Sequence, residues 1–92
     1  MNNKRLREIR EKAINHCRLE LYLIDDAIAL VKECQMIDIP ILGIDGFKLS
    51  HGTIQPFMEH SIDLSEDDDC HEKALSFLDA HREFDLVYEV VY

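Results

Sequence analysis

The sequence has no long hydrophobic run. Its longest nearly apolar stretch, PILGI at residues 40–44, is far shorter than the roughly 20 residues that a membrane helix needs. The charged start MNNKRLREIREK also lacks the apolar core of a signal peptide. We therefore expect a cytoplasmic protein that does not enter a membrane.

Cysteine is scarce, and the common catalytic signatures are missing. The chain has only Cys17, Cys34 and Cys70, in no CxxC spacing, and with 47% hydrophobic residues its core needs no disulfide support. It contains no glycine-rich phosphate loop, no GxSxG elbow and no HExxH pair. These absences favour a reduced protein that is not an enzyme and uses no cofactor.

Basic residues are rare beyond the N-terminal region. Residues 1–18 hold six Lys or Arg against two Glu, a balance of +4, whereas residues 19–92 hold four basic against seventeen acidic residues, a balance of -13; the sum is the formal charge of -9. A surface of this sign repels phosphate backbones and attracts cationic partners. We therefore predict a basic protein as the partner, and no nucleic acid.

The first part of the chain is predicted to be helical. Apolar residues recur at every third or fourth position from Leu6 to Val31, with no Gly or Pro before Gln35. A single helix of about 30 residues would reach roughly 45 Å, longer than a domain of this size is wide, so we expect a break or bend at residues 15–18. The second half, residues 19–36, is then the central core helix.

A β-hairpin is predicted next. Two extended runs rich in Ile and Leu, residues 40–49 and 54–64, are joined by the turn SHGT at residues 50–53. Pro56 has no N–H to donate to a neighbouring strand, so we expect it at the edge or start of its strand. The stretch 43–46, GIDG, is typical of a bulge or tight bend.

A helix and a final strand complete the predicted fold. Ser65 resembles a helix cap, and the apolar stripe that follows runs to about Arg82. The β-branched run FDLVYEVVY at residues 84–92 predicts a strand, and a crossover helix would place it parallel to the second hairpin strand. We therefore predict a single α+β domain over residues 1–92, with two N-terminal helices or one bent helix and a small three-stranded mixed sheet.

The acidic run DLSEDDDCHEKA at residues 63–74 is the most unusual local feature. It does not fit a calcium loop, because Asp68 stands where an EF-hand needs glycine and Ala74 stands where it needs glutamate. Carboxylates suit the start of a helix, yet a cap needs only one or two. The excess either keeps the protein soluble or forms a docking patch. Its six acids are Asp63, Glu66, Asp67, Asp68, Asp69 and Glu72.

Strand alternation predicts a second acidic surface. If the even-numbered apolar residues of the strands face the core, then acids of all three strands lie on the opposite face. Those acids are Asp45, Glu59, Asp63, Asp85 and Glu89. The apolar residues Ile41, Phe47, Val87 and Val91 would share this face. Such a mixture indicates an interface, although acids at the rim of a covered sheet would give the same pattern.

Histidine and cysteine supply the alternative hypothesis. Cys70, His71 and His81 are the best ligand set, but structural zinc needs a second short-spaced pair, which the chain lacks. A thiol at a helix start can be activated, whereas the acids around Cys70 oppose this. The alternative is a small enzyme or metal-binding domain that uses His60, His71 or Cys70; otherwise we predict no catalytic residue and no metal.

Three segments carry a family resemblance. With IPILGIDGF at residues 39–47, EHSIDLS at 59–65 and VYEVVY at 87–92, the short acidic chain resembles the small α+β immunity proteins of bacterial polymorphic toxin and contact-dependent growth inhibition systems. The resemblance implies a stoichiometric inhibitor that binds a cognate toxin domain, often a nuclease, inside the cell. It implies no particular binding residue; the acids named above are the candidates for partner binding.

Overall fold

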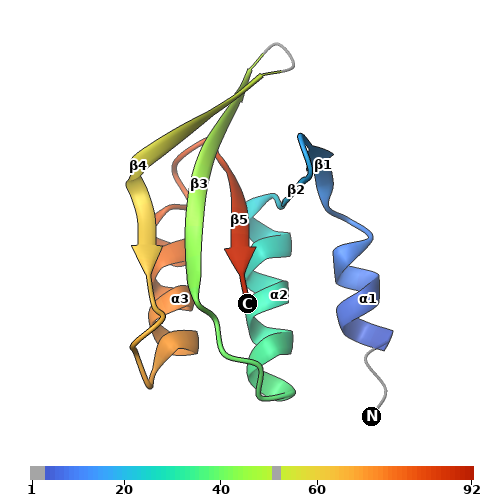
Figure 1. The fold of residues 1–92 in the computed structure, drawn as a ribbon, viewed down its shortest axis with the longest axis vertical. Helices are drawn as coiled ribbons and strands as arrows, with labels where there is room; N and C mark the ends of the chain where they lie inside the picture. Colours follow the sequence, from blue (N-terminus) through green and yellow to red (C-terminus); the bar gives the residue numbers. More distant parts are fainter. Residues whose placement is uncertain (1–3, 51–52) are drawn as a thin grey trace.

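A three-stranded antiparallel sheet carries two helices on one face, and a small hairpin covers part of the other. The computed structural model describes residues 4–50 and 53–92, with the backbone alone at residues 56–59. The elements are α1 (Lys4–Arg10), β1 (Ile14–His16), β2 (Leu19–Leu21), α2 (Ile24–Met36), β3 (Gly43–Ser50), β4 (Thr53–Asp63), α3 (Cys70–Ala80) and β5 (Val87–Val91). Figure 1 shows α2 and α3 side by side behind the sheet, with α1 on the other side of α2, next to β1 and β2. Leu6 and Ile9 of α1 pack into the larger apolar cluster. The predicted α+β class is confirmed.

The N-terminal region differs from the prediction. The chain does break at residues 15–18, but it forms the antiparallel hairpin β1–β2 there, and residues 19–21 are strand rather than helix. Cys17 and Arg18 form its two-residue turn with φ of 51° and 69°, the left-handed pair that a tight hairpin turn requires. Leu21 packs against strand residues of the main sheet, so tertiary burial outweighs the helical spacing here.

Helix α2 occupies the position predicted for the core helix but begins later. Asp25 and Asp26 lie in its first turn, where carboxylates complement the positive end of the helix dipole. It ends at Met36, and the left-handed Asp38, with φ of 60°, redirects the chain before Pro40. Its buried side chains are Ala27, Leu30, Val31 and Cys34.

The predicted hairpin is confirmed as β3–β4. The two strands pair antiparallel from Gly43 opposite Asp63 to Ser50 opposite Thr53, and the register shifts between Asp45 and Gly46, as the bulge prediction required. A Cβ atom at Gly46 would lie 2.9 Å from the carbonyl oxygen of His60, so only glycine fits there. Pro56 lies on β4, an outer strand of this sheet. Residues 51 and 52 of the predicted turn lie outside the described residues.

The mixed sheet was a wrong prediction. Strand β5 runs in the same direction as β4, but β3 lies between them, so every pairing in the order β4-β3-β5 is antiparallel. The connection from β4 through α3 to β5 therefore passes over β3. Strand β5 pairs with the edge of β3 that β4 does not occupy. On its far side β5 meets Tyr22, whose N–H and C=O pair with those of Tyr88 at 2.8 Å each.

The start of α3 was also predicted wrongly. Ser65 caps no helix; its N–H and hydroxyl donate to Oδ1 of Asp63 at 3.0 and 2.8 Å, a local turn that competes with helix formation. The helix begins five residues later at Cys70, with Asp69 in the cap position. It ends at Ala80 with His81 as its C-cap, close to the predicted end.

Two apolar clusters hold these layers together. The larger lies between the helices and the sheet and includes Ile9, Tyr22, Leu30, Ile44 and Tyr88. The smaller lies on the other face, where Leu21, Phe47 and Val87 are buried together at the β1–β2 hairpin. None of the described helices combines the length and apolar character that crossing a membrane requires.

Candidate functional site

The sheet face that faces away from α2 and α3 carries a row of polar side chains. The register places Asp45 of β3 opposite Glu89 of β5 on one side and opposite Ser61 of β4 on the other. Asp63 stands in the next row, opposite Gly43. Strand alternation therefore brought Asp45, Asp63 and Glu89 to one face, as predicted from the sequence.

The remaining predictions for this face fare differently. Asp85 precedes β5 and is exposed, so it is not part of the ladder. Glu59 falls in the irregular part of β4, and its side chain lies outside the described residues. Ile41 precedes β3 and is buried in the larger cluster on the opposite side. Phe47 and Val87 share the predicted face, but both are buried in the smaller cluster.

Asp45 and Glu89 form a pair of like charges. Burial raises the pKa of Glu89, and the neighbouring Asp45 carboxylate raises it further. Within residues 4–50 and 53–92, neither side chain takes part in an ion pair. Like charges opposite each other destabilise a sheet, so the fold tolerates this pair at a cost.

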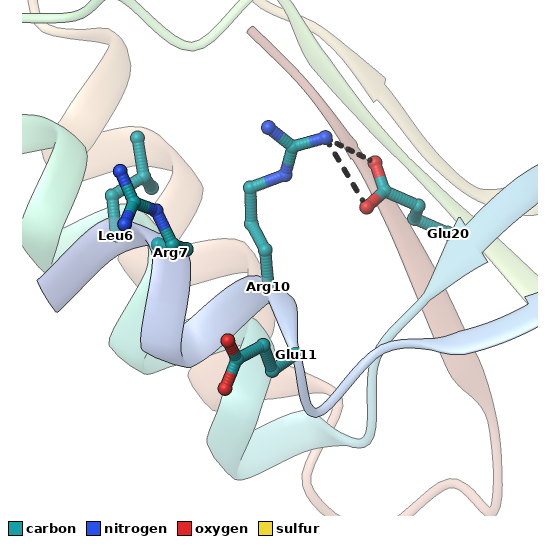
Figure 2. Close-up of a pocket in the computed structure, with 5 residues that line it drawn as sticks. All are labelled: Leu6, Arg7, Arg10, Glu11 and Glu20. Atoms are coloured by element: carbon teal, nitrogen blue, oxygen red, sulfur yellow. Dashed lines mark hydrogen bonds and ion pairs between the residues drawn. The ribbon is translucent and has the colours of Figure 1, made fainter. Parts of the chain in front are cut away.

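A cleft of about 390 Å³ lies beside this pair. It is lined by Arg10, Glu20, Glu89, Val90, Val91 and Tyr92. Nη2 of Arg10 binds both carboxylate oxygens of Glu20, at 3.0 and 3.3 Å. Figure 2 shows this ion pair bridging from α1 to β2, at the border of a second cleft of about 380 Å³ that also reaches Arg7. Arg10 and Glu20 thus line both hollows.

Two tyrosines lie close to the ion pair. Tyr22 is 1% exposed, and its hydroxyl makes no hydrogen bond of ordinary length among the described residues, although Arg10 lies close enough to it to lower its pKa. Burial, followed by the charge of Glu20, raises the pKa of Tyr22 to about 12. Burial also raises the pKa of Tyr92, against the opposing charge of Arg10. No sequence pattern could indicate this group, because its members come from three distant segments.

The acidic run at residues 63–72 is partly neutralised within the protein. Asp63 accepts the two hydrogen bonds of Ser65, which hold its pKa below the ordinary value. Nζ of Lys73 lies 2.8 Å from Oδ1 of Asp67 and 3.5 Å from Oδ1 of Asp69. The other three acids of the run are exposed and make no ion pair within the part of the chain that the structure describes; they are Glu66, Asp68 and Glu72.

The alternative histidine and cysteine site is divided between the two ends of α3. At the start, Cys70 is 4% exposed and its sulfur accepts the N–H of Ile41, while Nε2 of His71 lies 2.6 Å from the carbonyl oxygen of Ile39. At the other end, Nε2 of His81 lies 2.9 Å from Nδ1 of His60. A helix of eleven residues separates these ends by roughly 15 Å.

The His60–His81 pair was not predicted. His81 is fixed by Phe77, whose carbonyl oxygen lies 2.7 Å from Nδ1, and the ring of Phe84 packs against both imidazoles. Among the described residues, no three His, Cys, Asp or Glu side chains are arranged to hold a metal ion. The pair therefore joins β4 to the end of α3 and resembles none of the ligand sets considered from the sequence.

Comparisons with protein-family models, curated proteins and solved structures gave no significant match. The function is therefore inferred from the charges, clefts and exposed side chains of this chain. On the sheet face and at the adjoining cleft, Asp45 and Glu89 make no ion pair among the described residues, and the exposed apolar side chains of Val91 and Leu42 lie nearby. Such a surface can bind a cationic protein surface.

Proposed function

We propose that this protein is an immunity-type inhibitor that binds and neutralises a basic toxin domain acting in the cytoplasm, with a nuclease as the best candidate. The observation that carries the proposal is the Asp45–Glu89 pair, whose like charges lie side by side without an ion pair to any cation among the described residues. A basic residue of a partner would remove the repulsion. A nuclease needs a basic surface to hold the phosphates of its substrate. Such a surface is complementary in charge to this acidic face.

The charge of the whole molecule supports the same partner class. The balance of -13 over residues 19–92 produces a field that attracts a basic domain before contact. At the sheet face, each Lys or Arg that a partner places against Asp45 or Glu89 would replace a repulsion with an attraction. The long-range field and the local contact therefore favour one kind of partner.

The proposal is tested with the product of the reading frame that neighbours this gene. If that product contains a toxin domain, coexpression with this protein should abolish its toxicity, and the two should form a one-to-one complex without metal. Association should slow several-fold as ionic strength rises from low to physiological, while dissociation changes less. Unrelieved toxicity in the presence of excess folded protein would refute the proposal.

A second candidate function is supported by the short contact between His60 and His81. A small enzyme or metal-binding domain that uses His60 would need this pair, whereas His71 and Cys70 lie at the other end of α3. Dialysis against a chelator separates the candidates, because an inhibitor of the proposed kind would keep its fold and its partner. Loss of either after chelation would favour the second candidate.

A further inference from the structure

In the cleft beside Glu89, one carboxylate has no paired cation among the described residues. Its lining contributes one cation, Arg10, and two carboxylates, Glu20 and Glu89. Arg10 already binds both oxygens of Glu20, at 3.0 and 3.3 Å. Glu89 is therefore the carboxylate of the cleft that no described cation holds, and the charge of Asp45 adds to it from the neighbouring strand.

The buried hydroxyl of Tyr22 is a second and independent sign of a missing group. It makes no hydrogen bond of ordinary length among the described residues, although the side chain is 1% exposed. Tyr22 directly follows β2, two residues after Glu20, and Arg10 lies close enough to it to lower its pKa. A buried hydroxyl that makes no hydrogen bond of ordinary length is costly, so this border of the cleft lacks a polar partner.

Exposed apolar side chains lie at and beside the polar cleft and suit a protein partner. Val91 and Tyr92 are each 37% exposed and Leu42 is 42% exposed. Leu42 is held next to Val91 by a hydrogen bond of 2.7 Å from its N–H to the Val91 carbonyl oxygen. Apolar groups around a central charged contact exclude water from it, an arrangement typical of the residues that dominate binding at protein interfaces.

We propose that this cleft seats one arginine of the basic partner, with Glu89 as its carboxylate acceptor, Asp45 as the supporting charge and Tyr92 as the aromatic wall. This inference rests on the proposed function, and it identifies the residues that would contact the basic partner. Arginine fits better than lysine, because its planar guanidinium can bind a carboxylate with two N–H groups and stack on a tyrosine ring. Inside the same molecule, Nη2 of Arg10 already contacts both carboxylate oxygens of Glu20. The acidic run at residues 63–72 then attracts the partner without seating it, since Ser65 and Lys73 already engage half of its acids.

The first test uses nona-arginine as the probe and compares two substitutions that each remove one negative charge. Glu89→Gln should weaken binding of the peptide at least about tenfold, because the acceptor of the seated guanidinium is lost. Glu83→Gln, at an exposed position outside the cleft, should weaken it less than about twofold. Equal losses in the two variants would show attraction by net charge alone and would overturn the seat at Glu89.

A second variant and a second probe sharpen the result. Arg10→Gln frees Glu20 for a second guanidinium and should strengthen binding of nona-arginine, and nona-lysine should bind the parent protein more weakly. In amide NMR spectra the peptide should shift Glu89, Val91 and Tyr92 before residues 66–72. If residues 66–72 shift first, or if Glu89→Gln neutralises the toxin domain as well as the parent does, the seat is wrong while the proposed function stands. If no basic peptide or toxin domain binds the folded protein, both are refuted.

Discussion

Replacing Tyr22 with phenylalanine should stabilise this protein. The side chain is almost fully buried, and its hydroxyl makes no hydrogen bond of ordinary length among the described residues, although Arg10 lies close enough to lower its pKa. The ring packs in the larger apolar cluster with Ile9 and Tyr88. Phenylalanine keeps the ring and removes only the oxygen. The cost of leaving a buried hydroxyl unsatisfied is about 1–3 kcal/mol, so we expect a gain near the lower end, about 1 kcal/mol. For a domain of this size such a gain corresponds to an increase of about 4–8 °C in Tm.

Tyr88→Phe is the matched control. Tyr88 is buried in the same cluster, but its hydroxyl donates to the carbonyl oxygen of His81 at 3.5 Å. Removing this long hydrogen bond should leave stability unchanged or lower it by up to about 1 kcal/mol. Urea unfolding at pH 7.5, followed by circular dichroism, compares the two variants with the parent. A Tyr22→Phe variant that is less stable than the parent would show that the hydroxyl has a partner, and it would remove one of the two observations behind the arginine seat.

The same substitution has a signature at alkaline pH. The folded pKa of Tyr22, about 12, lies above the ordinary tyrosine value of 10.0, so folding favours the protonated phenol. The free energy of unfolding of the parent is therefore unaffected by this ionisation below pH 10, and it falls as the pH rises through about 12. The pKa values of Tyr88 and Tyr92 are raised as well, so part of the alkaline loss should persist in Tyr22→Phe. An unchanged alkaline profile would contradict the assignment to Tyr22.

Three further variants test the sheet and the acidic run. Glu89→Gln should stabilise the free protein. Because the folded pKa of Glu89 is raised, ionisation of its carboxyl group lowers the stability of the parent as the pH rises through that value. The urea midpoints of variant and parent should therefore differ most near pH 7 and converge near pH 4. Gly46→Ala should destabilise the fold by about 1–3 kcal/mol, because the new Cβ would lie 2.9 Å from the carbonyl oxygen of His60; an unchanged Tm would show that β4 can move aside. The triple variant Asp67→Asn, Asp69→Asn, Glu72→Gln should keep the fold and slow association with the toxin domain more than it speeds dissociation; a large increase in the dissociation rate would make this run part of the seat.

The elements that could be predicted from the sequence are those whose local pattern and tertiary burial agree. Strands β3 and β4 are extended runs joined by a turn, and β5 is rich in valine, so each was found close to its position. The pairing of β5 with β3 was not predicted, because a strand with this sequence pattern can pair with the free edge of either hairpin strand. The period of two along β3 and β5 sufficed to place Asp45 and Glu89 on one face, whereas Asp85 lies before the ladder begins.

The hairpin β1–β2 and the cleft could not be predicted, for different reasons. The spacing of Leu19, Leu21 and their neighbours suits a helix as well as a strand, and Cys17 and Arg18 are not the residues that usually mark a left-handed turn. The cleft needs Arg10 from α1, Glu20 from β2 and Glu89 from β5, and no local pattern connects residues so far apart. Only the packed structure brings them together.

The reciprocal hydrogen bonds between Tyr22 and Tyr88 have a consequence for how the chain folds. They join residues 66 positions apart, and β5 must also reach back to β3, so the fold closes only when its early and late segments meet. Contacts of such long range slow folding, since the loop must be closed before they contribute energy. A ribosome-bound chain would hold the β1–β2 hairpin without its final neighbour until β5 emerged. The amide protons of Tyr22 and Tyr88 should accordingly be among the slowest to exchange, because releasing them requires the two segments to part.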